Sequence, residues 1–280
     1  MSKFVKTNNI QLHYLEKGEA GKPVLILMHG LTANAHSFDR IMRGLNGFHI
    51  FSVDLRGRGL SDKPKTNYTM KDHAADIIGM IEALGLQKVY FGGHSFGALL
   101  SIYLAANFPE RVKKIVLIDA AARLNPNVKE MVAPSMLRLG KTWANMHDYF
   151  AKAKAAIYVD GMWNNDIENY YRADIVENTD GSVTTQSNLA NITQAIEGAL
   201  GLGLQWLEYI QSIEQPALLI NATEPYGING EPILPKNLAL ETVKMMKNCT
   251  YQHVSGNHLT MLFGKGADES AQAINLFLKK

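Results

Sequence analysis

The chain has 280 residues, 46% hydrophobic and 19% charged, so it can bury the core of one large globular domain, with or without an insertion. Its 28 Lys and Arg residues nearly balance 26 Asp and Glu residues, and the formal net charge of +2 gives no reason to expect nucleic acid or a membrane surface as partner. Cys249 is the only cysteine, which excludes an internal disulfide and a metal centre built from cysteines.

The N-terminal residues carry no apolar run of signal-peptide length, and no later run approaches the ~20 apolar residues of a membrane span. We therefore expect a soluble, cytoplasmic protein whose partner is a small-molecule substrate, without nucleic acid or membrane. The sequence does not indicate an oligomeric state.

Two kinds of strand are predicted at the start of the chain. Residues 4–6 and 10–16 alternate between apolar and polar side chains around Asn8-Asn9, which predicts a β-hairpin. Residues 24–28 are continuously apolar, as in a strand from the middle of a parallel sheet.

A helix over 38–45 and a strand over 48–53 follow. The polar loop 54–62 is not a dinucleotide-binding loop, because Gly57-Arg58-Gly59 lacks the third glycine and does not open a helix. A capping-box pattern then predicts the start of a helix over 69–84.

A glycine-flanked serine lies where the next strand, at 89–91, turns into a helix over 97–107, and it reads G-x-S-x-G: Gly93, Ser95, Gly97. Such a turn strains the middle residue, and side chains two positions on either side would collide, so glycine is needed at both. Ser95 is predicted to stand at the tip of the turn, where helix N–H groups favour a developing negative charge. This geometry suits a nucleophile.

With this motif the chain resembles the α/β-hydrolase superfamily at both ends of the sequence, while the resemblance fades in the middle. It implies an α/β fold, the α/β-hydrolase fold: a mostly parallel central sheet flanked by helices, with a helical cap insertion. The pair His29-Gly30 also matches the family. By this resemblance, the backbone N–H groups of Leu31 and Phe96 form an oxyanion hole, and His29 is a structural histidine that bonds the loop.

Strand and helix stop alternating after a buried strand at 115–118 that ends in Asp119. The resemblance implies that residues 121–211 form the helical cap, and that residues 1–120 and 212–280 form the core domain.

Many large aromatic and Met side chains occur within the predicted cap. They indicate a mainly apolar pocket. Trp143, Tyr158 and Trp163 are the candidate substrate-binding residues.

The sheet is predicted to resume at 216–220, with a helix over 238–246, a strand over 250–254 and a last helix over 268–278. His258 lies in a glycine-bearing loop just before the last helix, which makes it the candidate catalytic base. His94, beside the nucleophile, is expected to point the wrong way along the turn.

A serine hydroxyl needs a base within hydrogen-bond reach and a third group that orients the base. Ser95 and His258 supply two members of such a triad. In the commonest family arrangement an aspartate would stand at position 225, where this chain has Pro225. Glu224, one position earlier, and Asp119, where some branches of the family place the acid, both stay candidates.

These residues predict a serine hydrolase that cleaves a carboxylic ester, or a related acyl bond such as a thioester or lactone, of a small and mainly hydrophobic substrate through an acyl-enzyme on Ser95. No metal and no organic cofactor is required. The dehalogenases and epoxide hydrolases of this fold use aspartate at the nucleophile position, so serine disfavours both. A carbon–carbon bond hydrolase or lyase on the same triad, and a ligand sensor with little turnover, stay open.

Overall fold

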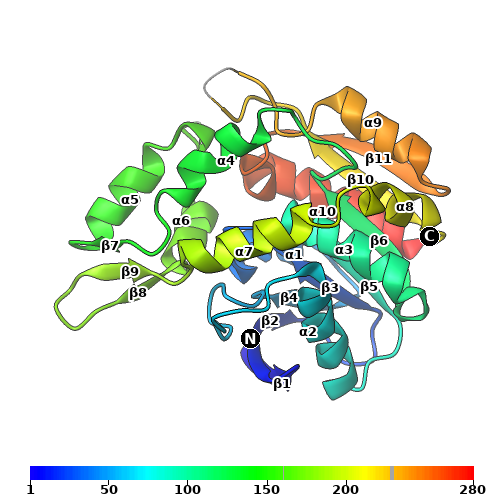
Figure 1. Ribbon diagram of the computed structural model, residues 1–280, viewed down its shortest axis with the longest axis horizontal. Helices are drawn as coiled ribbons and strands as arrows, with labels where there is room; N and C mark the ends of the chain where they lie inside the picture. The colour runs from blue at the N-terminus through cyan, green and yellow to red at the C-terminus, as the bar shows by residue number, and fades with distance from the viewer. Residues whose placement is uncertain (160, 228–229) are drawn as a thin grey trace.

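Eight strands form one sheet through the centre of the molecule (Figure 1). The computed structural model describes residues 1–159, 161–227 and 230–280. The strand order is β1-β2-β4-β3-β5-β6-β10-β11, in which β2 runs antiparallel to β1 and β4 and the other neighbours are parallel. The strands are β1 (Ser2–Thr7), β2 (Ile10–Lys17), β3 (Val24–Met28), β4 (His49–Val53), β5 (Val89–His94), β6 (Val112–Ile118), β10 (Ala217–Ala222) and β11 (Cys249–Val254). The predicted mostly parallel sheet is confirmed.

Helices cover both faces of this sheet. They are α1 (Asp39–Gly44), α2 (Met70–Ala83), α3 (Phe96–Asn107), α9 (Lys236–Met245) and α10 (Gly264–Lys279), with short 3-10 turns η1 (Ala35–Phe38), η2 (Pro109–Arg111) and η4 (Thr260–Leu262). Apolar residues of α2, α3 and α9 belong to one core, and those of α1 and α10 to the other.

Side chains of each central strand alternate between these two cores, because successive residues of a strand face opposite sides. In β3, Ile26 and Met28 pack into the first core, whereas Leu25 and Leu27 pack into the second. Burial on both faces explains why the strand is continuously apolar.

Two local patterns formed as the sequence predicts. Asn8 and Asn9 adopt positive φ values of 40° and 62° between β1 and β2, as a tight hairpin turn requires. At the start of α2, the Asp72 N–H donates to Thr69 Oγ1 and the Thr69 N–H donates to Asp72 Oδ2, which completes the capping box.

Much of the segment between β6 and β10 projects to one side of the sheet (Figure 1). It contains α4 (Val128–Met136), β7 (Thr142–Trp143), α5 (Met146–Lys154), η3 (Ile157–Val159), α6 (Asn165–Arg172), β8 (Ile175–Glu177), β9 (Val183–Thr185), α7 (Leu189–Leu200) and α8 (Gln205–Ser212). The segment is mainly helical, and β7, β9 and β8 also form a small antiparallel sheet, which the expectation of a helical cap did not include. Gly181, at φ 82°, turns the chain between β8 and β9.

The last helix of the range 121–211 packs with the core helices. Helix α8 lies against α3, and its Ile210 belongs to the same buried core as the apolar residues of α3. The projecting part of the segment in Figure 1 is therefore built by α4 to α6 and β7 to β9.

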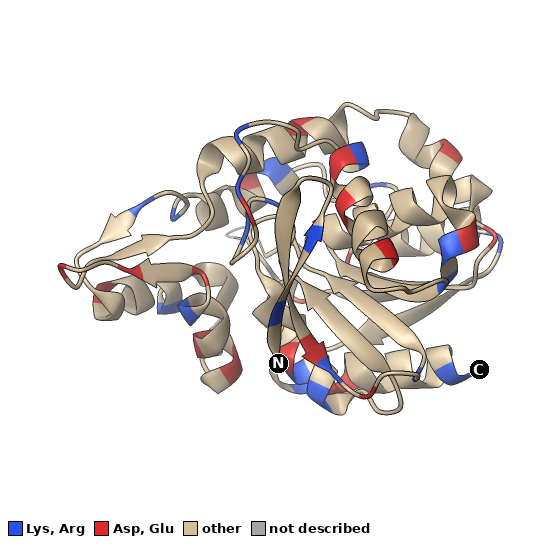
Figure 2. Cartoon of the chain, turned by 90° about the horizontal axis from the view of Figure 1, so that it is seen from below, with Lys and Arg blue, Asp and Glu red and all other residues tan. Residues whose placement is uncertain are grey.

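Acidic and basic residues are interspersed along the chain in the view of Figure 2. No helix in the described residues is long and apolar enough to cross a membrane.

Candidate active site

Ser95 stands at a sharp turn between β5 and α3. Its backbone has φ 52° and ψ −115°, a strained conformation for a residue with a side chain, and its N–H donates to the Ile118 carbonyl at 2.9 Å. A Cβ at Gly93 would lie 2.1 Å from the Gly97 carbonyl carbon, and one at Gly97 would lie 1.9 Å from the Met28 carbonyl oxygen. Only glycine fits at these two flanking positions, as the motif predicts.

His258 and Asp119 meet at the carboxyl edge of the sheet. His258 Nδ1 lies 2.7 Å from Asp119 Oδ2, and both side chains are buried. The carboxylate fixes the ring orientation and leaves Nε2, the nitrogen that a nucleophilic hydroxyl needs, without a partner among the described residues.

The other oxygen of Asp119 is held by the neighbouring strand. Asp119 Oδ1 accepts hydrogen bonds from the Asn221 side-chain amide at 2.9 Å and from the Ala222 backbone N–H at 3.0 Å. Because both oxygens are bonded, the carboxylate of this buried acid has a fixed direction.

Glu224 plays a different part. Its exposed side chain accepts a hydrogen bond from the Gly256 N–H at 2.8 Å, and its own N–H donates to the Gly256 carbonyl at 3.2 Å. Glu224 therefore holds the backbone of the His258 loop and does not bond the imidazole. Of the two candidate acids, the structure brings Asp119 to His258.

His94 also contacts His258, contrary to the expectation that it points away from the site. The two rings have centroids 4.5 Å apart, and His94 Nε2 donates to the His258 carbonyl at 2.8 Å. Burial, with the nearby His258, holds the pKa of His94 well below its ordinary value, so the ring is neutral. His94 thus holds the histidine loop and does not act as a second base.

The two expected oxyanion donors lie beside the serine. A Cβ added to Gly30 would come within 3.6 Å of Ser95 Cβ, which places the Gly30-Leu31 peptide next to Ser95. Neither the Leu31 N–H nor the Phe96 N–H has an acceptor within the ranges that the structure describes. The first N–H groups of a helix have no intrahelical acceptor, so Phe96 N–H is available to a ligand.

Arg58 lies directly behind these two donors. Its fully buried guanidinium donates to the Leu31 carbonyl at 3.1 Å, and the guanidinium carbon is 5.3 Å from the centre of the Phe96 ring. It also donates to the Arg56 carbonyl and to His73 Nε2. Burial lowers the pKa of Arg58 to about 10, which still leaves the side chain positively charged near neutral pH.

His29 is structural, as the sequence indicates. Its Nδ1–H donates to the Gly30 carbonyl at 2.7 Å, and its Nε2 accepts from the Leu55 N–H at 3.0 Å. Burial lowers the pKa of His29 to about 4, so the ring is neutral and acts as a fixed brace between two loops.

Two of the three expected pocket residues, Trp143 and Tyr158, line a cavity of about 490 Å³ in the segment between β6 and β10. Tyr158 stacks on Tyr226 with ring centroids 5.3 Å apart, and Tyr226 meets His258 edge-on at 5.6 Å. Trp163 instead packs behind the cavity wall, stacked on Tyr171 at 5.6 Å.

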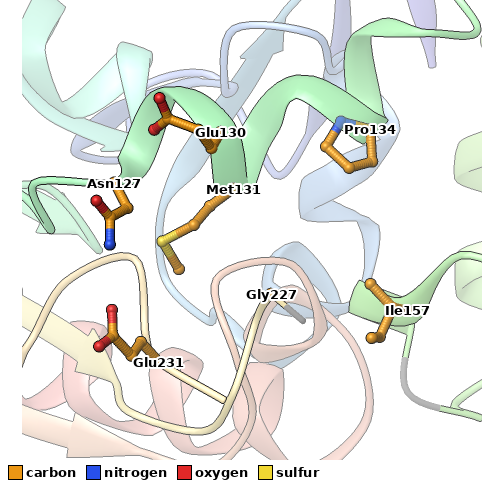
Figure 3. Close-up of a pocket in the computed structure, with 7 residues that line it drawn as sticks. All are labelled: Asn127, Glu130, Met131, Pro134, Ile157, Gly227 and Glu231. Atoms are coloured by element: carbon orange, nitrogen blue, oxygen red, sulfur yellow. The ribbon is translucent and has the colours of Figure 1, made fainter. Parts of the chain in front are cut away.

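A second, smaller pocket of about 180 Å³ lies between α4 and the loop after β10 (Figure 3). It shares Pro134 and Ile157 with the larger cavity, so the two adjoin. Glu130 and Glu231 on its wall give it an acidic character.

No cluster of three or more His, Cys, Asp or Glu side chains is placed to hold a metal ion in residues 1–159, 161–227 and 230–280.

Sequence reasoning missed four supporting residues: His94, Arg58, Asn221 and Tyr226. Arg58 could have been singled out, because it is the second arginine of the glycine-containing loop 54–62. An arginine that is buried in such a loop must find several hydrogen-bond acceptors. The contacts of Asn221 and Tyr226 depend on tertiary structure, and no local pattern marks them.

Comparisons with known proteins agree with this architecture. A family model described as the alpha/beta hydrolase fold matches residues 23–254. The 2-(acetamidomethylene)succinate hydrolase of Mesorhizobium japonicum is 40% identical over 120 residues, 42% of this chain and 42% of that protein. Epoxide hydrolase 4 of Mus musculus is 30% identical over 118 residues, 41% of this chain and 33% of that protein. The chain thus spans less than half the length of these curated relatives.

The crystal structure of E-2-(acetamidomethylene)succinate hydrolase has a TM-score of 0.85 with this structure at 24% sequence identity, over 100% of this chain and 99% of that chain. This likeness shows a common fold from end to end. Since the family model covers most of the sequence, the protein belongs to the α/β-hydrolase family.

Proposed function

We propose that the protein is a serine hydrolase that cleaves an ester, or a related acyl bond such as a thioester or lactone, of a small and mainly hydrophobic substrate. The observation that carries this proposal is the 2.7 Å contact between His258 and Asp119, at the sheet edge where Ser95 stands on its strained turn. A serine, an oriented imidazole and unpaired backbone N–H groups are the parts that acyl transfer needs.

In the proposed mechanism, His258 Nε2 takes the proton of the Ser95 hydroxyl as the oxygen attacks the substrate carbonyl carbon. The Leu31 and Phe96 N–H groups stabilise the oxyanion of the tetrahedral intermediate. His258 then gives its proton to the leaving group, which departs and leaves an acyl group on Ser95. Water activated by the same imidazole attacks this acyl group and releases the acid.

In this mechanism Asp119 keeps Nδ1 of His258 protonated, so that Nε2 is the nitrogen that serves Ser95. It also stabilises the imidazolium that forms during each half-reaction. Because Asn221 and Ala222 occupy its second oxygen, Asp119 can keep this orientation through both steps.

A carboxylic amide is a second candidate bond. The relative that is 40% identical over 120 residues bears a name that describes a substrate with an acetamido group, and an amide carbonyl can be attacked by the same serine. The epoxide hydrolase among the relatives supports no equal claim, because the turn here carries Ser95 in place of an aspartate.

A test needs no knowledge of the natural substrate. An alkyl fluorophosphonate should label Ser95, detected by mass spectrometry of the intact protein and of its peptides. Short-chain para-nitrophenyl esters should be hydrolysed, and Ser95→Ala should abolish both labelling and hydrolysis.

Labelling at another residue, or hydrolysis unchanged in Ser95→Ala, would overturn the proposal. Labelling and ligand binding with negligible turnover would favour a ligand sensor. Turnover of a diketone, with products from carbon–carbon cleavage and none of the esters hydrolysed, would favour a carbon–carbon bond hydrolase.

A further inference from the structure

The cap cavity of about 490 Å³ has mostly apolar walls. They come from the C-terminal end of α4 and the residues after it, from β7, α5 and η3, and from Tyr171 of α6. Tyr149 and Tyr171 are buried in the wall, whereas Leu137 and Ile157 are exposed at the cavity. Such walls suit the hydrocarbon part of a small organic molecule.

Two contacts connect this cavity to the candidate catalytic groups. On one side, Arg138 Nη2 donates to the Thr32 carbonyl at 2.7 Å, and Thr32 follows the oxyanion donor Leu31. On the other side, Tyr158 of the wall stacks on Tyr226, which contacts His258. The cavity wall therefore contacts the oxyanion loop directly through Arg138, and it reaches the histidine through the stacked rings of Tyr158 and Tyr226.

Among the described residues, this wall carries three charged side chains, and all of them are basic: Arg138, Lys141 and Lys152. Arg138 is already neutralised, because its Nε donates to Asp174 Oδ2 at 2.9 Å. Burial alone would lower the pKa of Arg138, but Asp174 raises it well above its ordinary value.

Lys141 and Lys152 differ from Arg138. Both are exposed, and neither forms an ion pair with any residue in the described ranges. The cavity thus combines apolar walls with two positive charges that form no ion pair within the described chain, whereas the two glutamates nearby, Glu130 and Glu231, line the adjoining pocket.

We infer that this cavity receives a negatively charged group of the substrate, so that the preferred substrate is an acyl compound with a carboxylate at the end of an apolar body. The inference rests on the proposed function for the position of the scissile bond at Ser95. Lys141 and Lys152 would attract the carboxylate, and the aromatic walls would pack against the hydrocarbon chain between the two ends.

Binding to Ser95→Ala tests this without requiring turnover. Two probes differ only in charge: the para-nitrophenyl half-ester of glutarate, and its neutral isostere with an isopropyl group in place of the carboxylate. Calorimetry at low salt should show the anionic probe binding about tenfold more tightly, since partly exposed ion pairs each contribute several-fold.

Replacing both lysines, Lys141→Gln with Lys152→Gln, should remove this preference and leave the affinity for the neutral probe unchanged. Lys154→Gln is the matched control, because Lys154 is exposed on the same helix as Lys152 but lies over the Trp163 ring at 4.9 Å, away from the cavity wall. Raising the ionic strength from ~0.05 to ~0.5 M should weaken the preference, because exposed charges are screened.

Equal affinity for the two probes, or a preference that survives in the double variant, would overturn the inference. Hydrolysis of both probes by the unsubstituted protein is measured in parallel. If both probes are hydrolysed in a Ser95-dependent way but the anionic one is not preferred, the inference is wrong and the proposed function stands. If the anionic probe is preferred in a lysine-dependent way but neither probe is hydrolysed, the anion-binding cavity stands and the proposed function is wrong.

Discussion

The side chain of His94 supports the backbone of His258: its Nε2 donates to the His258 carbonyl at 2.8 Å, from the position directly before Ser95 in the sequence. The strand that delivers Ser95 therefore also fixes the loop that delivers the candidate base.

Removing this support should slow the reaction without removing any reacting group. For His94→Ala we expect kcat on a para-nitrophenyl ester to fall about tenfold, because small displacements of a catalytic group are costly. For His94→Gln, whose amide can donate to the same carbonyl, most of the rate should return. Equal losses in the two variants would show that the hydrogen bond is not what matters.

Replacing each of the two candidate acids by its amide should separate their roles. Asp119→Asn should lower kcat by ~10³- to 10⁴-fold, because an amide at this position stabilises the wrong imidazole tautomer. Glu224→Gln should change kcat by less than about threefold, since an amide oxygen can still accept from the Gly256 N–H. Steady-state kinetics with circular dichroism of each variant checks this, and the opposite order would reassign the acid to Glu224.

Arg58 should affect the transition state more than substrate binding. Because its guanidinium bonds the Leu31 carbonyl and lies over Phe96, Arg58→Met should lower kcat by ~10- to 100-fold with little change in KM. Arg56→Lys is the control, since Arg56 is buried in the same loop but pairs with Asp76. We expect this control to lower the melting temperature and to leave kcat nearly unchanged; a fall in kcat of the same size in both variants would assign Arg58 a purely structural part.

Buried neutral histidines should make stability fall in mild acid. His29 titrates at about 4 in the folded protein, against roughly 6.5 in an unfolded chain. Between these two pH values the unfolded chain binds a proton that the folded chain does not, so the free energy of unfolding decreases by about 1.4 kcal/mol for each unit that the pH falls. His73 and His94, whose pKa values burial also holds well below the ordinary value, steepen the dependence.

Urea denaturation at several pH values from 7 to 4 measures this slope. His29→Gln keeps an acceptor for the Leu55 N–H but cannot titrate, so the slope should be smaller by about one proton. An identical slope in the variant would mean that His29 is protonated in the folded protein as well.

The central sheet was predictable because its strands obey simple rules. Residues 24–28 and 115–118 are apolar throughout, as burial on both faces demands, and the hairpin turn at Asn8-Asn9 has residues that tolerate positive φ. The small sheet of β7, β9 and β8 was not predicted, because β8 and β9 have only 3 residues each and cannot show a clear alternation of apolar and polar side chains.

The acid could not be chosen from the sequence for a different reason. Asp119 and Glu224 both follow strands that end at the same edge of the sheet, and sequence gives no distance from either to His258. The choice depends on where each carboxylate finds its donors: Glu224 is drawn to the Gly256 N–H, while Asp119 lies under the imidazole.

The hydrogen bond from the Ser95 N–H to the Ile118 carbonyl ties Ser95 to the residue just before Asp119. Two members of the proposed triad thus belong to one rigid ladder, and their separation cannot change unless neighbouring strands come apart. His258 joins this pair from a loop whose backbone is held by two side chains, His94 and Glu224, so substitution of either one can change the position of the imidazole while the sheet itself stays in register.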